Sequence, residues 1–120
     1  MHPTFIRRTV QIVKECGGNC FLTDSAGGAN YSIGYTEDVF GCPIYPAAGI
    51  NDRYFYKKKT GSNIIPYIEV AGFLNDADFL INLSHSKGHG NCAYGGAIKN
   101  LAMGGVTANT RRDIHSVMSK

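Results

Sequence analysis

The sequence predicts one α/β domain over residues 1–120, with a mostly parallel sheet flanked by helices. Near the N-terminus, a helical pattern ends at two glycines and leads into a short apolar stretch and a polar loop. In the last third, the apolar stretch FLINL at 79–83 leads into a glycine-rich segment and a second helical pattern. Helix, glycine, strand and polar loop form the repeating step of an α/β domain. A chain of 120 residues suits a single domain with one core.

The first element is expected to be a helix over residues 3–16, because apolar residues recur there at helical spacing. These residues are Phe5, Ile6, Val10 and Val13. Gly17 ends the helix, since glycine tolerates the left-handed cap. Residues 19–23 then predict a short buried strand, and residues 24–28 form the loop that leaves its carboxyl end.

The middle of the chain predicts shorter elements. A short helix is expected at 36–40, with Thr36 as its cap, followed by an extended stretch at 42–46. Residues 53–59 alternate weakly and predict a strand, which a turn follows. Pro66 argues against a central strand just after that turn, because proline has no N–H to donate.

The last third predicts two helical segments and a strand. Residues 69–75 are expected to form a short helical segment, and residues 79–83 a second buried strand. A helix is expected at 94–103, starting at Gly95 and Gly96 and closed by another pair of glycines. The glycine-rich loop with its histidines and lysines would therefore lie at the carboxyl end of a parallel strand, where ligands bind in open α/β sheets.

Composition and charge exclude several classes of protein. The net charge is only +3, and the lysine run at 57–59 is typical of a solvated strand end, so nucleic acid is not an expected partner. No apolar stretch approaches the length of a membrane span, and the N-terminus lacks a signal-peptide core. The four cysteines form no Cys-x-x-Cys pair, so no iron–sulfur cluster is expected within the chain. Free thiols without a signal sequence predict a cytoplasmic protein.

The stretch SHSKGHGNCAYGGAIKN, residues 84–100, carries the strongest functional signal. The amides of Gly95 and Gly96 at a helix start suit an anion, because the donors of the first turn are unpaired. Lys99 lies about one turn further along and adds a positive charge. A standard phosphate loop is excluded, because Gly96 and Ala97 stand where lysine and serine or threonine are required. The expected partner is a small anionic ligand with a phosphate or carboxylate group.

Histidines add a second kind of chemistry to this stretch, because imidazoles serve as metal ligands or proton carriers. His89 and Lys99 are the expected catalytic residues. The expected metal ligands are His85 and His115, with nickel, iron or zinc as the metal. The expected cofactor-binding residues are Ser84, Lys87, Gly95, Gly96 and Lys99, with Asp24 and Ser25 from across the cleft.

The two ends of the chain carry long motifs, HPTFIRRTVQIVKECGGNCFLTDSAGG and DADFLINLSHSKGHGNCAYGGAIKNLAMGG. Together with the later His115 they resemble the domain-of-unknown-function 362 family over nearly the whole chain. Members are commonly cytoplasmic proteins of anaerobes, and many carry a ferredoxin-like iron–sulfur module after this domain. The resemblance thus implies redox chemistry and a ferredoxin-like domain or protein as partner. No cysteine follows Cys92, so that module is not expected within this chain.

The same segment is more distantly similar to lactate racemase, which has a histidine, a Gly-Gly-x-Lys segment and a later histidine in comparable order. This similarity implies that Lys99 tethers a nickel-pincer nucleotide, that His115 ligates the nickel and that His89 is the acid or base. The chain differs in having one more residue in its Gly-Gly-Ala-Ile-Lys segment.

The main hypothesis is a cytoplasmic domain that binds a metal or an anionic cofactor for redox or isomerase-type chemistry. One alternative is a non-catalytic module that binds an anion or docks a ferredoxin-like partner, in which replacing His89 would barely change ligand affinity. The other is a truncated, inactive domain, which would leave apolar surface exposed or covered in a homodimer.

Overall fold

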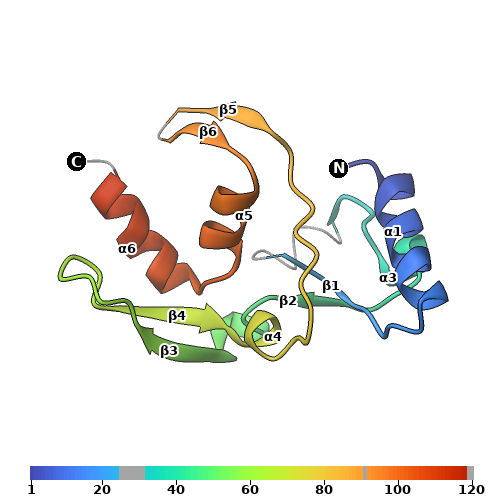
Figure 1. Cartoon of the computed structure of the whole chain (residues 1–120), viewed down its shortest axis with the longest axis horizontal. Helices are drawn as coiled ribbons and strands as arrows, with labels where there is room; N and C mark the ends of the chain where they lie inside the picture. Colours follow the sequence, from blue (N-terminus) through green and yellow to red (C-terminus); the bar gives the residue numbers. More distant parts are fainter. Residues whose placement is uncertain (25–31, 91, 119–120) are drawn as a thin grey trace.

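The computed structural model describes residues 1–24, 32–90 and 92–118 (Figure 1). Helices and three small two-stranded sheets confirm the mixed α/β class. Within the described residues one strand pair is parallel and two are antiparallel, so the strands do not join into the single mostly parallel sheet that was predicted. Across the same residues, the helices are too short or too polar to cross a membrane.

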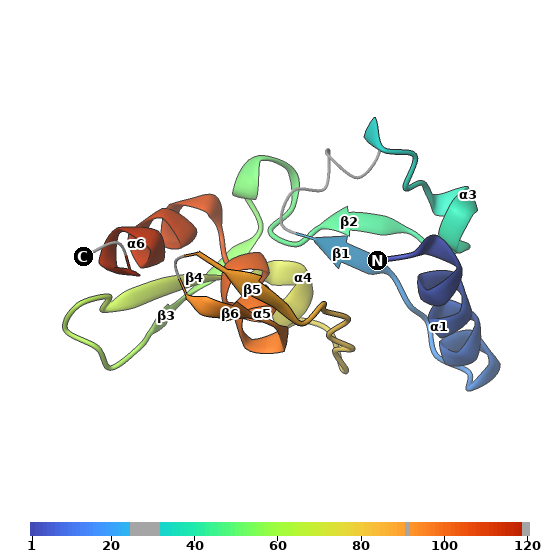
Figure 2. The same ribbon diagram turned by 90° about the horizontal axis from the view of Figure 1, so that it is seen from above.

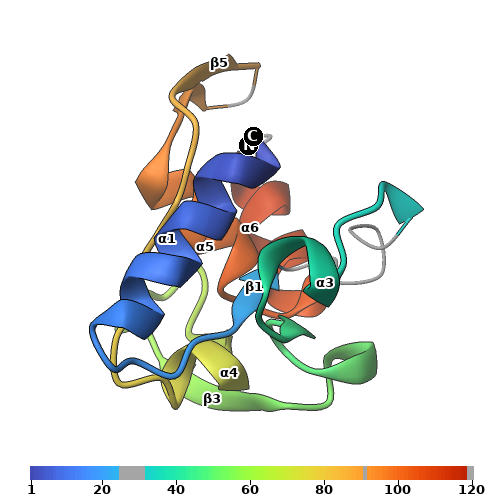
Figure 3. The ribbon, with the colours of Figure 1, turned by 90° about the vertical axis from the view of Figure 1, so that its right-hand side faces the viewer.

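The first helix, α1, spans Pro3–Glu15 and confirms the N-terminal prediction. The ring Nδ1 of His2 accepts a hydrogen bond from a first-turn amide at 3.3 Å and caps the helix. Val10 is buried, and α1 packs beside α3 (Glu37–Phe40), as Figure 3 shows. Gly17 ends the last turn with φ at 83°, a conformation that favours glycine.

A parallel pair of strands, β1 (Leu22–Asp24) and β2 (Ile44–Pro46), follows these helices in the fold. The predicted strand at 19–23 and the extended stretch at 42–46 correspond to this pair, although β1 starts later than predicted. The helices and the pair share the main apolar core. Its buried members are Val10, Phe40, Cys42 and Ile44. The short helix α3 has Thr36 as its N-cap, as predicted.

An antiparallel hairpin, β3 (Phe55–Lys59) and β4 (Tyr67–Ala71), follows in the middle of the sequence. The strand predicted at 53–59 is thereby confirmed. The short helix α4 (Gly72–Asn75) follows β4 directly. A second, smaller core of buried alanines lies here, where Ala47, Ala48 and Ala71 meet.

Two predictions for the last third are wrong, one in part and one in full. The helical segment predicted at 69–75 is confirmed at Gly72–Asn75, which is α4. Its first part is a strand, because Glu69 pairs with Lys57 across the hairpin and the strand ladder satisfies its backbone groups. Residues 79–83 form neither a strand nor a buried segment. No neighbouring strand pairs with them in the described structure, and Phe79 is 81% exposed.

The glycine-rich stretch folds as a hairpin and a helix. β5 (Lys87–His89) pairs with β6 (Ala93–Gly95), and α5 (Ala97–Gly104) follows. The helix predicted at 94–103 therefore starts later, because its first residues belong to β6. The predicted loop at the carboxyl end of a parallel strand is replaced by this antiparallel hairpin.

The last helix, α6 (Ala108–Met118), was not predicted. The amide of Ala108, its first residue, donates to Oδ2 of Asp52 at 2.6 Å. Asp52 belongs to the single turn η1 (Ile50–Asp52). Oγ1 of Thr110 accepts a hydrogen bond at 2.9 Å from the amide of Glu69 on β4. Partners far away in the sequence therefore hold this helix. In Figure 2, α1 and α3 occupy one end of the molecule, and the β3–β4 hairpin and α6 occupy the other.

Candidate functional site

The β5–β6 hairpin places two of the predicted site residues on one face. Lys87 and His89 are two residues apart on β5, so their side chains project to the same side of the hairpin. Lys87 lies opposite Gly95, and His89 lies opposite Ala93. The hairpin, rather than the end of a parallel strand, positions this part of the site.

Gly95 and Gly96 join the hairpin to α5, and both are buried. A Cβ added at Gly95 would lie 3.6 Å from Cγ of Lys87 and 3.6 Å from Cδ of Lys99. A Cβ added at Gly96 would lie 2.7 Å from the ring of Tyr94 and would displace it. Two lysine side chains therefore converge on a stretch of backbone that carries no side chain of its own.

His89 shares its electrostatic environment with three other basic side chains. Its pKa is lowered from the ordinary 6.5, first by desolvation and then by the positive charges of Lys99, Lys87 and His115. His115 comes from α6, outside the hairpin. His89 is therefore a neutral imidazole at pH 7 in positively charged surroundings.

Cys92 is a candidate that the sequence interpretation missed. Its Sγ lies 3.1 Å from Nδ1 of His89, within hydrogen-bond distance, and the residue is half-buried in the turn between the strands. The available signal was the His-x-x-Cys spacing beside a glycine, because a tight turn brings residues three apart together. The contact holds the imidazole of His89 through one of its two nitrogens.

The remaining predicted residues lie outside the hairpin. Ser84 is half-buried and His85 is exposed, and both precede β5. Asp24 ends β1, in the parallel pair. Neither His85 nor Asp24 lies on the hairpin that carries His89. Ser25 lies outside the described residues.

A ready metal site is absent from the described residues. No group of three or more His, Cys, Asp or Glu side chains among them is arranged to hold a metal ion. The charges of Lys87 and Lys99 would also repel a cation. The cluster around His89 therefore suits an anion better, and the assignment of His85 and His115 as metal ligands stays a prediction.

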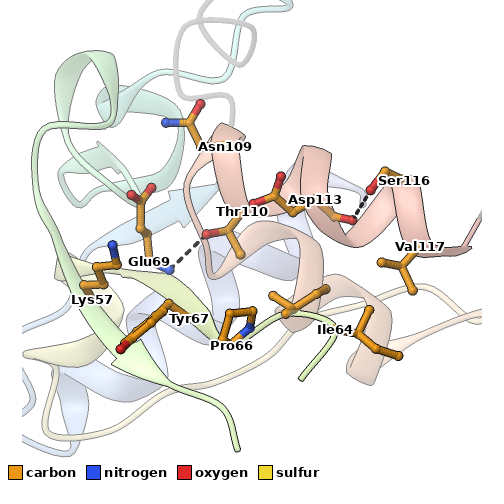
Figure 4. Close-up of a pocket in the computed structure, with 11 residues that line it drawn as sticks. Lys57, Ile64, Pro66, Tyr67, Glu69, Asn109, Thr110, Asp113, Ser116 and Val117 are labelled. Atoms are coloured by element: carbon orange, nitrogen blue, oxygen red, sulfur yellow. Dashed lines mark hydrogen bonds between the residues drawn. The ribbon is translucent and has the colours of Figure 1, made fainter. Parts of the chain in front are cut away.

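A separate groove of about 360 Å³ lies between the β3–β4 hairpin and α6 (Figure 4). Ile64 and Val117 are among its apolar side chains, and Lys57, Glu69 and Asp113 contribute charges of both signs. Its described lining contains none of the predicted site residues. This mixed lining favours no single class of ligand, so the hairpin is the better candidate site.

Comparison with known proteins identifies the family. The family model described as Domain of unknown function (DUF362) matches residues 1–120. Among curated proteins and solved structures, none matches this chain. The more distant similarity to lactate racemase is therefore not confirmed. Because the family match covers the chain from its first residue to its last, this protein belongs to the DUF362 family.

Proposed function

We propose that this domain binds a small anionic molecule, with a phosphate or carboxylate group, at the β5–β6 hairpin and the first turn of α5. The observation that carries the proposal is the convergence of Lys87 and Lys99 on Gly95. The pKa of His89 is lowered first by desolvation and then by the charges of these two lysines and His115. Ammonium groups are compact charges that suit such oxygens. Gly96, the N-cap of α5, has no side chain to cap the first-turn amides, which leaves these donors for a ligand.

His89 adds proton transfer to this site. With its pKa lowered by desolvation and by Lys99, it is neutral at pH 7 and can accept a proton from a bound molecule. Proton abstraction of this kind is what isomerase-type chemistry requires. A bound anion would stabilise the imidazolium form, so binding is expected to be accompanied by proton uptake at mildly acidic pH.

Calorimetric titration with sodium sulfate, which stays dianionic around neutral pH, tests the binding. Lys87→Ala and Lys99→Ala are each expected to weaken affinity about tenfold, since a hydrogen bond to a charged group is worth roughly 1.5 kcal/mol or more. Lys59→Ala makes the same change on exposed β3 and is the matched control. Equal affinity in all three variants would contradict the proposal. Failure of the wild-type chain to bind sulfate, phosphate or simple carboxylates would also contradict it.

His89→Gln separates binding from proton transfer. Glutamine keeps a polar side chain but does not titrate, so affinity is expected to stay within about threefold while the proton uptake disappears. Proton uptake is measured by repeating the titration in buffers of different ionisation enthalpy. If wild-type binding shows no proton uptake, the domain is instead a non-catalytic module of the anion-binding or ferredoxin-docking kind.

A phosphate-bearing cofactor would meet the same residues as a free anion. The half-buried Lys99, packed against Gly95, is the side chain best placed for a covalent tether. Intact mass and metal analysis of protein purified anaerobically from its host distinguish the two cases. Added mass on Lys99 would support a tethered cofactor for redox or isomerase-type chemistry, and an unmodified mass would support an exchangeable ligand.

A further inference from the structure

The connection between α4 and β5, residues 77–86, runs alongside α5 without joining a sheet (Figure 1). Side chains tether it there. Nδ2 of Asn82 donates to the carbonyl of Ala97 at 2.8 Å, and Nδ2 of Asn100 donates to Oδ1 of Asn82 at 3.0 Å. In the described part of the chain, residues 77–86 make no hydrogen bond from backbone to backbone. The carbonyl of Leu83 accepts a hydrogen bond from Nδ2 of Asn100 at 3.5 Å. Within the described part of the chain the other main-chain donors and acceptors of this run have no such partner, so they are open to a second chain.

The same connection carries large apolar side chains on the surface. Leu80 is 42% exposed and Ile81 47%, next to the still more exposed Phe79. Ile98, on the neighbouring α5, is 88% exposed. An apolar run with open backbone groups is an edge that native proteins cover or pair.

The total surface of the chain exceeds that expected of a compact monomer of its mass. The chain exposes 8043 Å², whereas a compact monomer of its 13.0 kDa mass would expose about 6,300 Å². The excess, roughly 1,700 Å² on the same scaling, is greater than the ~800 Å² that each partner contributes to a standard interface. The excess exposed surface is therefore large enough to include one side of a standard interface.

We propose that residues 79–86 pair with the same segment of a second copy of this chain, as antiparallel strands related by a twofold axis. Antiparallel self-pairing satisfies, in a closed dimer, the backbone groups that each copy directs toward the other. Asp76 and Asp78 precede the apolar run. His85 and Lys87 follow it. Antiparallel pairing places the acidic end of one copy beside the basic end of the other, whereas parallel pairing would place like charges together.

A second copy supplies the neighbour that the FLINL stretch lacks. The apolar pattern predicts a buried strand at 79–83, whereas in the described structure these residues pair with no strand, and Phe79, Leu80 and Ile81 are exposed. The pairing is independent of anion binding, although the segment continues into β5 and so joins the strand that carries Lys87 and His89.

Light scattering on the full chain eluting from a gel-filtration column tests the proposal. The wild-type chain is expected to show twice the 13.0 kDa chain mass at micromolar concentration. Ile81→Lys is expected to give the monomer, because the paired strands would bury two new charges. Ile50→Lys makes the same change at an exposed isoleucine of η1 and is expected to remain dimeric. A monomeric wild-type chain, or a dimeric Ile81→Lys variant, would overturn the proposal.

Hydrogen exchange on the wild-type chain keeps the test decisive if the lysine variant fails to fold. Amides of residues 79–86 are expected to be protected at high protein concentration and to lose that protection on dilution below the dissociation constant. Fast exchange of these amides in a dimer would assign the interface to another surface and refute the pairing. Open-ended aggregation in place of a closed dimer would refute the twofold arrangement.

Discussion

The end of the molecule built from α1, β1, α3 and β2 differs from the region around the β5–β6 hairpin and α5 (Figure 3). In the first, Val10, Phe40 and Ile44 are buried together. In the second, Phe79 and Ile98 are exposed, and the buried positions between the hairpin and α5 are glycines. The first region stabilises itself by apolar packing. The second presents backbone, positive charge and apolar surface, which suits contacts with a ligand and a second copy.

Truncating one large apolar side chain in each region gives the largest expected contrast. Phe40→Ala is expected to lower the free energy of unfolding by about 3–5 kcal/mol, because a buried phenylalanine leaves a cavity. Phe40 is 2% exposed, and its ring lies 5.3 Å from that of Tyr35 between centroids. Ile98→Ala is expected to change the same quantity by less than about 0.5 kcal/mol in the monomer. Urea unfolding measures both, and similar losses would remove the distinction between the regions.

Cysteine reactivity gives a second test of the difference between the two regions, because both contain cysteine. Burial, followed by the nearby Cys20, raises the pKa of Cys42 from 9.0 to about 11. At pH 8 the native Cys42 is therefore expected to react with iodoacetamide about 100-fold more slowly than an ordinary thiol. The exposed Cys16 and the half-buried Cys92 are internal references for the same digest. Equal labelling of Cys42 and Cys16 in the folded protein would contradict the burial.

The raised pKa of Cys42 also predicts how stability depends on pH. The unfolded chain loses this proton near pH 9, whereas the folded chain keeps it until about pH 11. The contribution is therefore fully present below pH 9 and is lost as the pH rises between these values. The free energy of unfolding, measured between pH 9 and pH 11, is expected to fall in the wild-type chain and to fall less in Cys42→Ala.

The sequence predicted the region of α1, β1, α3 and β2 better than the hairpin region, because the signals for its elements are local. Helical spacing, a glycine stop and a short apolar strand describe α1 and β1 without reference to distant residues. Glu69 was assigned to a helix because its strand partner, Lys57, lies across a hairpin that local pattern does not reveal. The helix α6 was missed for the same reason, since Thr110 and Ala108 are held by Glu69 and Asp52.

The residues that the sequence singled out for a site lie in a different architecture from the one predicted, and their roles stay predictions. Lys87, Lys99 and His115 do act on His89 electrostatically, although a hairpin and not a strand end places them there. The FLINL stretch predicted burial from its apolar residues alone, and burial of a strand also requires a neighbour to pair with. The contact between Cys92 and His89 was not predicted, because it depends on a turn that the pattern does not specify.

The charges around His89 give a smaller but specific test of the hairpin region. Removing Lys99 in Lys99→Ala is expected to raise the pKa of His89, because the lysine charge is one of the causes that lower it. Proton NMR titration of the imidazole measures the change, with Lys59→Ala as control. Because the pKa of His89 is lower in the folded chain, the unfolded chain binds more protons below pH 6.5. The contribution of His89 to stability is therefore fully present above pH 6.5 and is lost as the pH falls. An unchanged pKa of His89 in Lys99→Ala would show that the charge of Lys99 does not act on His89.

The smallest expected effect on stability comes from the exposed ion pair of α1, on the surface of the region built from α1, β1, α3 and β2. Nη1 of Arg8 and Oε1 of Glu15 are 3.3 Å apart, and both side chains are more than half exposed. Solvent screens such pairs, so Glu15→Gln is expected to cost no more than about 0.5 kcal/mol of unfolding free energy. If urea unfolding instead showed a loss close to that of Phe40→Ala, surface charge would contribute as much as the core. The stability of this region would then not come mainly from its apolar packing, and the contrast with the hairpin region would have to be explained by charge.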